Sequence, residues 1–139
     1  MSTHARFEET DLHDEPPDPG FYPSSITTAR LRRSASGNRM VHVVFALDGV
    51  APGHDRVAEY FVLEGASSRG LALARRRLVE LYRVCGREPR PGDEIEPADL
   101  VGARVEVKVE HETWQGETRL RVVGHRRLVA DAGADSVPF

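Results

Sequence analysis

The sequence predicts a mainly β protein, a small barrel of five strands and one helix in the order β-β-β-α-β-β. Three observations predict this fold. Apolar residues recur at every second position in several segments, turn-forming residues separate these segments, and one stretch between the third and the fourth strand changes to a helical period. The chain has 139 residues, which is enough for one domain with a core of its own.

The first three predicted strands form a meander. Residues 25–33 are rich in β-branched side chains, and the turn-forming sequence SASGN follows them. Residues 40–48 carry apolar side chains on both faces, which indicates a strand covered from two sides. Residues 56–64 form the third strand, in which alternation directs Phe61 toward the core and Tyr60 to the other side.

A helix follows the meander. From Leu71 to Cys85 the apolar residues have helical spacing, which places Cys85 on the apolar face as a small buried side chain. Ser67 or Ser68 can cap the first turn, and Gly86 stands where a helix of this length ends. The sequence therefore predicts one helix between the third and the fourth strand.

The last two predicted strands form the strongest hairpin signal in the chain. Residues 104–114 alternate valines with charged side chains, Gln-Gly provides a two-residue turn, and residues 117–124 return with the same alternation. Five strands with a helix after the third is the connectivity of the OB-fold, a partly open barrel that binds oligonucleotides. Other small layouts of five strands and one helix remain as alternatives.

Charge and composition divide the chain into three parts. Residues 1–19 are acidic and proline-containing and predict a disordered leader, residues 20–129 form the barrel domain, and residues 130–139 form an acidic tail. Residues 1–20 hold six acids and one arginine, a charge of −5, so a net charge of −3 leaves +2 for the rest. A mildly basic body between acidic ends is compatible with a polyanionic partner.

Several classes of protein are not supported by the sequence. No stretch is long and apolar enough to span a membrane, and no export signal is visible, so we expect a cytoplasmic protein without a membrane partner. A single cysteine cannot form an internal disulfide, which fits a reducing compartment. The histidines have no metal-binding spacing, and no nucleophile or phosphate-loop motif is present. We therefore expect a protein that is not an enzyme, with no catalytic residue, metal or cofactor.

Basic and aromatic residues gather near the first turn and on the last hairpin. A barrel that binds single strands needs cations to follow phosphates and aromatic faces on which bases stack. The predicted nucleic-acid-binding residues are Arg30, Arg32, Arg33, Arg39, Tyr60, Lys108, Trp114, Gln115, Arg119 and Arg121. The glutamates that alternate with the basic residues on the last hairpin count against this interpretation, because cross-strand ion pairs would neutralise part of the charge.

The segment from Gly20 to about Leu128 resembles phage- and prophage-encoded single-stranded-DNA-binding proteins, a family with an OB-fold. The likeness lies in the meander, in the helix LALARRRLVELYRVCG and in the ending DLVGARVEVKVEHETWQGETRLRVVG. It implies largely sequence-independent binding of single-stranded DNA in replication, recombination or repair, and assembly of the barrels into homo-oligomers.

The C-terminal DSVPF is similar to the tip of bacterial single-stranded-DNA-binding proteins, which recruits replication and recombination proteins. The resemblance implies a partner-binding tip made of Asp131, Asp135, Val137, Pro138 and Phe139. A buried aromatic would anchor such an interface, and the acids would steer it. Two alternatives remain: an adaptor between proteins without significant DNA affinity, and an RNA-binding OB-fold.

Overall fold

The computed structural model describes residue 5 and residues 16–128. Most of the predicted leader and the whole predicted partner-binding tip, residues 131–139, lie outside the described residues. The elements are β1 (Gly20–Arg33), β2 (Arg39–Leu47), β3 (Arg56–Val62), α1 (Ser68–Val84), the short 3-10 helix η2 (Pro97–Leu100), β4 (Arg104–Trp114) and β5 (Glu117–Arg127). No helix among the described residues is long and apolar enough to cross a membrane.

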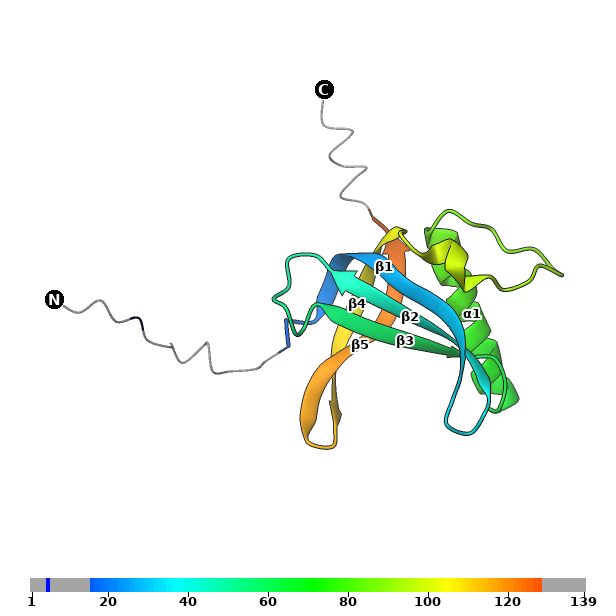
Figure 1. The fold of residues 1–139 in the computed structure, drawn as a ribbon, viewed down its shortest axis with the longest axis horizontal. Coiled ribbons are helices and arrows are strands. Elements are labelled where there is room, and N and C mark those ends of the chain that lie inside the picture. Colours follow the sequence, from blue (N-terminus) through cyan, green and yellow to red (C-terminus); the bar gives the residue numbers. More distant parts are fainter. Residues whose placement is uncertain (1–4, 6–15, 129–139) are drawn as a thin grey trace, which may run out of the picture.

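The five strands form one antiparallel sheet in the order β3-β2-β1-β4-β5. Strand β1 belongs to both halves, since residues 24–33 pair with β2 and residues 20–25 pair with β4. The sheet curls about this shared strand, and α1 packs against both of its edge strands, β3 and β5 (Figure 1). The mainly β fold with its order of strands and helix is confirmed.

The five strands do not close into the barrel that the sequence predicted. No backbone ladder joins β3 to β5 among the described residues, although the two edge strands lie close to one another. Side chains from β3, β5 and α1 occupy the seam instead. The predicted barrel is therefore corrected to a curled, open sheet whose edges are joined by side chains.

A bulge bends β1 where its two halves meet. The register with β2 shifts between Ile26 and Thr28. The chain before β4 binds the backbone exposed there: the Ile26 N–H donates to the Ala103 carbonyl (2.9 Å), and the Gly102 N–H donates to the Ile26 carbonyl (2.8 Å). Such a bulge increases the local bend, so one strand can serve both halves of the sheet.

Valines and aromatic residues fill the space inside the curl. The fully buried apolar residues include Val41, Val43, Phe45, Phe61, Leu81, Leu100, Val105, Val107 and Val109. The alternation in β3 is as predicted, because Phe61 is buried and Tyr60 is exposed. The second face of β2 is covered only in part, since Val44 and Ala46 are half-buried. The apolar residues on this face of β2 therefore do not indicate a strand that is fully covered from two sides.

The ends of α1 carry the predicted signals. The Ser67 hydroxyl accepts a hydrogen bond from the Gly70 N–H (3.0 Å), and Gly86 has a φ of 86° directly after the helix. Burial raises the pKa of the Cys85 thiol to about 11, so the thiol stays protonated at neutral pH. In the β4–β5 turn, Gln115 and Gly116 both have positive φ, as the predicted two-residue turn requires.

A buried polar network joins β3, β5 and α1 across the open seam. The His125 side chain is fully buried, and its Nε2 lies 2.6 Å from Glu59 Oε1. Its Nδ1 lies 2.8 Å from Glu80 Oε1 on α1. Arg77 of α1 pairs with the second oxygen of Glu59 and donates to the Val122 carbonyl of β5 (3.0 Å). The seam is therefore held by charged hydrogen bonds from three elements.

We expect His125→Ala to lower the free energy of unfolding by about 2–4 kcal/mol, because Glu59 and Glu80 lose a partner inside the seam. Urea unfolding followed by far-UV circular dichroism measures the change. His111→Ala is the control, since His111 is exposed and its Nε2 lies 2.7 Å from the Pro17 carbonyl; its effect should be about 0.5 kcal/mol. Equal effects of the two variants would contradict the role of the network.

Candidate nucleic-acid interface

A row of polar and aromatic side chains crosses the outer face of β1, β2 and β3. Register places Arg30, His42 and Tyr60 side by side on these three strands. The His42 and Tyr60 rings stack with centroids 4.7 Å apart and an angle of 10° between their planes. Arg32 approaches the same histidine, with Nη1 3.4 Å from Nδ1. Tyr60 remains 52% exposed, so half of an already oriented ring is open to a ligand.

His42 serves this row as a neutral ring. Burial, and then the guanidinium groups of Arg32 and Arg30, hold the pKa of His42 below its ordinary value of 6.5. At neutral pH the imidazole is therefore uncharged, and its Nδ1 can accept a hydrogen bond from Arg32. The stack gives Tyr60 a flat backing on one side without adding a charge.

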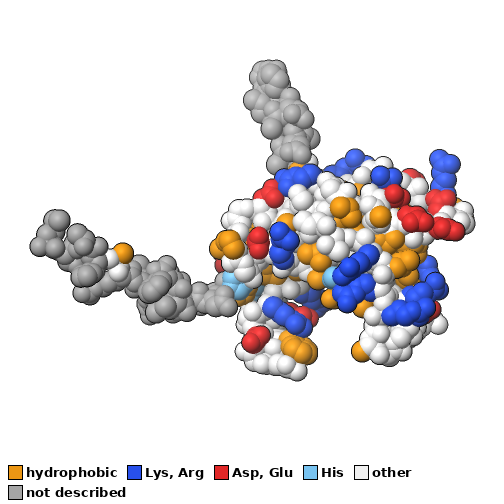
Figure 2. Space-filling model, in the orientation of Figure 1, with side chains coloured by type: hydrophobic (Ala, Val, Ile, Leu, Met, Phe, Trp, Pro, Cys, Tyr) orange, Lys and Arg blue, Asp and Glu red, His pale blue; other side chains and the backbone are white. Residues whose placement is uncertain are grey.

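A cleft of about 830 Å³ runs along the open seam between β3 and β5. Tyr60 and Arg56 line it from β3, and Arg119, Leu120 and Arg121 line it from β5. Three predicted residues, Tyr60, Arg119 and Arg121, thus share one cavity although they come from distant parts of the sequence. Figure 2 shows basic side chains around a hollow between the β4–β5 hairpin and the β1–β2 turn.

The tip of the β4–β5 hairpin carries an exposed indole. Trp114 is 51% exposed, and the Arg119 guanidinium lies over it, 4.6 Å from the ring centroid. Glu112 holds the same guanidinium at 3.4 Å, so part of the neutralisation expected from the glutamates is present. Gln115 is exposed in the turn. Arg121 lines the cleft and forms no ion pair with any residue that the structure describes, although register places Glu110 opposite it.

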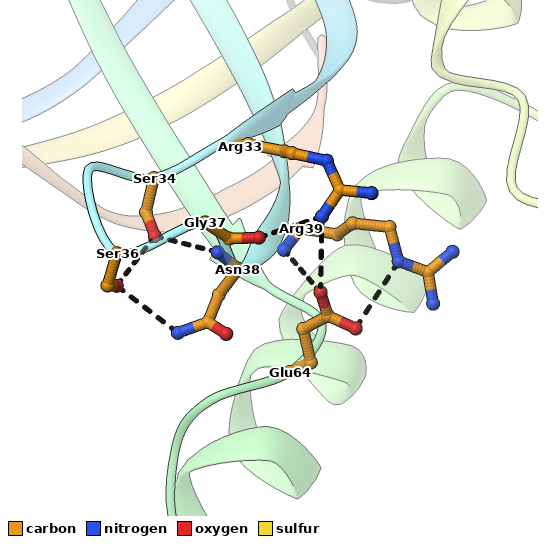
Figure 3. Close-up of polar contacts among 7 residues, drawn as sticks. All are labelled: Arg33, Ser34, Ser36, Gly37, Asn38, Arg39 and Glu64. Atoms are coloured by element: carbon orange, nitrogen blue, oxygen red, sulfur yellow. Dashed lines mark hydrogen bonds and ion pairs between the residues drawn. The ribbon is translucent and has the colours of Figure 1, made fainter.

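Arg33 and Arg39 do not join this face. Glu64 accepts the Arg39 N–H (2.8 Å) and Nε–H (3.3 Å) and lies 3.9 Å from Arg33 Nη1 (Figure 3). The hydrogen bond from the Arg39 backbone is the main cause that lowers the pKa of the Glu64 carboxyl. In the alternation of their strands both arginines oppose the side that carries Arg30 and Arg32. The Glu64 carboxylate thus neutralises part of the charge of Arg33 and Arg39.

The β1–β2 turn is also closed by its own hydrogen bonds. Ser34 Oγ accepts from the Asn38 N–H (3.2 Å), and Asn38 Nδ2 donates to Ser36 Oγ (3.2 Å) (Figure 3). Gly65 has a φ of 81°, and a Cβ there would meet the Asn38 amide at 2.0 Å. The turn and the segment after β3 therefore fit together closely, which gives the hollow a preformed wall.

Lys108 lies apart from the cleft. It faces outward on β4 opposite Phe21 of β1, with Nζ 6.0 Å from the ring centroid. Sequence reasoning did not select Phe21, Arg56 or Arg126. Arg56 could have been found, because it alternates with Tyr60 on β3, whereas Arg126 lies beyond the predicted end of the last strand.

The described residues offer no group of three or more His, Cys, Asp or Glu side chains able to hold a metal ion. The interface instead combines guanidinium groups, aromatic rings and a neutral imidazole with the carboxylates of Glu59, Glu112 and Glu117, which also line the cleft. A comparison of the chain with models of known protein families and with curated protein sequences gives no match.

We expect His42 to titrate below pH 6.5 in the folded protein and Arg32→Gln to raise its pKa. The pKa in the variant should still stay below 6.5, because burial is the largest cause of the shift. NMR titration of the imidazole resonances measures both values. A His42 pKa at or above 6.5, or one that does not respond to Arg32→Gln, would contradict the neutral stacked ring.

Proposed function

We propose that this protein binds single-stranded DNA without catalysis and largely without regard to sequence. One observation carries the proposal. Tyr60, backed by His42 at a centroid distance of 4.7 Å, stands at the wall of a cleft that Arg119 and Arg121 also line. An oriented aromatic face beside guanidinium groups is what an unpaired base and its phosphate need.

We propose that the fold is an OB-fold whose barrel stays open at one seam. The element order, the use of β1 in both halves of the sheet and the position of α1 between β3 and β4 support this. The outer face of β2 and β3 and the last hairpin are the ligand-binding regions of that fold. Tyr60 lies in the first region and Trp114 in the second.

Binding would proceed by stacking and charge rather than by recognition of base edges. A base stacks on the free part of Tyr60, and the phosphates on either side meet Arg30 and Arg32 on β1 or Arg121 on β5. Aromatic faces accept every base, so little sequence preference results. Each phosphate neutralised releases counterions, so affinity falls with salt by about 0.7 logarithmic units per contact and per tenfold change in salt.

The biological process and the partner proteins are inferred from the sequence resemblance alone. We propose that the protein acts in the cytoplasm during replication, recombination or repair in bacteria or their phages, and that Asp131–Phe139 recruits partner proteins. A terminal aromatic with nearby acids has the chemistry of a small docking peptide.

A second candidate, an adaptor between proteins, is favoured by the ion pairs of the outer surface. Arg119 pairs with Glu112 at 3.4 Å, and Arg126 pairs with Glu106 at 2.6 Å. These pairs reduce the positive potential that a polyanion would meet. DNA titration separates the two candidates, because an adaptor has no DNA affinity to lose.

We expect Tyr60→Ala to weaken binding of poly-dT about 5- to 100-fold, since one base loses its stacking surface. Arg121→Glu should also weaken binding and should reduce the slope of log K against log salt by about 0.7 or more. The quenching of Trp114 fluorescence at several salt concentrations measures both effects.

Arg90→Glu is the matched control for these variants, because it makes the same charge change on the exposed segment between α1 and η2. It should leave the affinity within about twofold of the native value. Native protein whose Trp114 emission and anisotropy do not respond to poly-dT at low salt would refute DNA binding and leave the adaptor.

We expect Glu64→Gln to tighten DNA binding about two- to fivefold at low salt, because Arg33 and Arg39 lose the carboxylate that compensates them. Glu88→Gln is the control, since Glu88 forms a comparable exposed pair with Arg83 (2.8 Å) at the end of α1. Equal affinities of the two variants would show that Glu64 does not limit binding.

A further inference from the structure

One arrangement of three side chains occurs twice on the β4–β5 hairpin and its neighbour β1. In the first copy, the Arg119 guanidinium lies 4.6 Å from the centroid of the Trp114 ring and 3.4 Å from the Glu112 carboxylate. The arginine is thus held on one side by an aromatic face and at its edge by an anion. This copy is part of the interface already described.

The second copy consists of Phe21, Arg126 and Glu106. The Arg126 guanidinium lies 3.6 Å from the centroid of the Phe21 ring, and its Nε donates to Glu106 Oε1 at 2.6 Å. Glu106 is almost buried, whereas the Arg126 side chain is 49% exposed and Phe21 is 39% exposed. A fixed carboxylate therefore anchors a guanidinium whose outer side is open.

A guanidinium held between a ring and a carboxylate in this way can serve as a stacking surface for a base. Unpaired bases stack on arginine planes as well as on aromatic rings. Arginine normally loses rotamer freedom on binding, but here Phe21 and Glu106 have already ordered Arg126. The ammonium of Lys108, 6.0 Å from the Phe21 centroid, adds a charge that a phosphate can meet.

Both copies lie on the same outward face. The alternate positions of β4 on this face are held by Glu106, Lys108, Glu110 and Glu112. Register places Arg126 opposite Glu106, Arg121 opposite Glu110 and Arg119 opposite Glu112. The two glutamates are six positions apart, which corresponds to about 20 Å along a strand. Lys108 and Arg121 stand between the two copies. Two cations therefore lie along the distance from one copy to the other, with Glu110 opposite Arg121.

We propose that Phe21, Arg126 and Glu106 form a second nucleotide-stacking site, which takes a further base of the same single strand. The strand leaves the first site at Trp114 and follows the outward face of β4 and β5, where Arg121 and Lys108 meet its phosphates. The inference rests on the proposed function and extends it by a defined path. It also gives Lys108 a role although this residue lies outside the cleft.

A single-tryptophan reporter tests the second site separately from the first. Phe21→Trp combined with Trp114→Phe places the only indole on Arg126. Titration with an oligothymidylate of about 25 nucleotides, longer than one barrel's usual site, should quench its fluorescence. Leu73→Trp combined with Trp114→Phe is the matched control, because Leu73 is exposed on α1, and its indole should not be quenched.

A second variant tests the arginine. In the native background, Arg126→Gln should weaken binding of the same oligonucleotide about 5- to 30-fold, because a stacking plane and a charge are both lost. An oligonucleotide of about three nucleotides, too short to span the distance between the two sites, should quench Trp114 in this variant as in the native chain. Circular dichroism confirms that each variant is folded.

The possible results separate the two proposals. Quenching of native Trp114 without quenching of the reporter at position 21, or an Arg126→Gln variant of native affinity, overturns the second site and leaves DNA binding in place. No quenching and no change in anisotropy with any chain overturns both. Capture of a protein by this face that Arg126→Gln abolishes, with no DNA effect, assigns the patch to a protein partner instead and also overturns the second site.

Discussion

The hydrogen-bonded network of His125, Glu59 and Arg77 determines the shape of the molecule. Every other junction of the sheet is a backbone ladder, but β3 meets β5 through these side chains, with His125 Nε2 2.6 Å from Glu59 Oε1. Charged groups are costly to bury unless each has a partner, and here each one does. Because the same network fixes α1 to both edges, it sets the width of the cleft and the position of Tyr60 on its wall.

The candidate site depends on orientation more than on the amount of charge. The molecule has an excess of acids, yet Arg30, Arg32 and Arg121 are left without carboxylate partners among the described residues on the face that Tyr60 occupies. Some arginines elsewhere are compensated, as Arg39 is by Glu64 and Arg104 by Asp48. The distribution of ion pairs thus leaves basic side chains available beside Tyr60 in a molecule of net negative charge, which composition alone does not reveal.

Caps, turns and the spacing of apolar residues predicted the helix and the strands well. They could not predict contacts between residues that are far apart in the sequence. Capping by Ser67 and the Gln-Gly turn are decided by neighbouring residues, so the sequence was sufficient. The first half of β1 has no alternation and contains Pro23, and only its pairing with β4 makes it a strand. The pairing of Glu64 with Arg33 and Arg39 could not be predicted, because it depends on how a turn folds against a distant strand end. The open seam likewise depends on side chains from three separate segments.

The seam between β3 and β5 is the junction of the sheet that deforms most easily. Pulling β1 away from β2 or β4 would break a row of backbone hydrogen bonds, whereas spreading β3 from β5 stretches only a few side-chain contacts around His125. Thermal breathing is therefore concentrated at the mouth that a ligand would enter. On the β5 rim the Val122 carbonyl and the His125 N–H are already bound by side chains of α1. An occupant that joins the two rims beside these contacts would lock this junction without rearranging the rest of the fold.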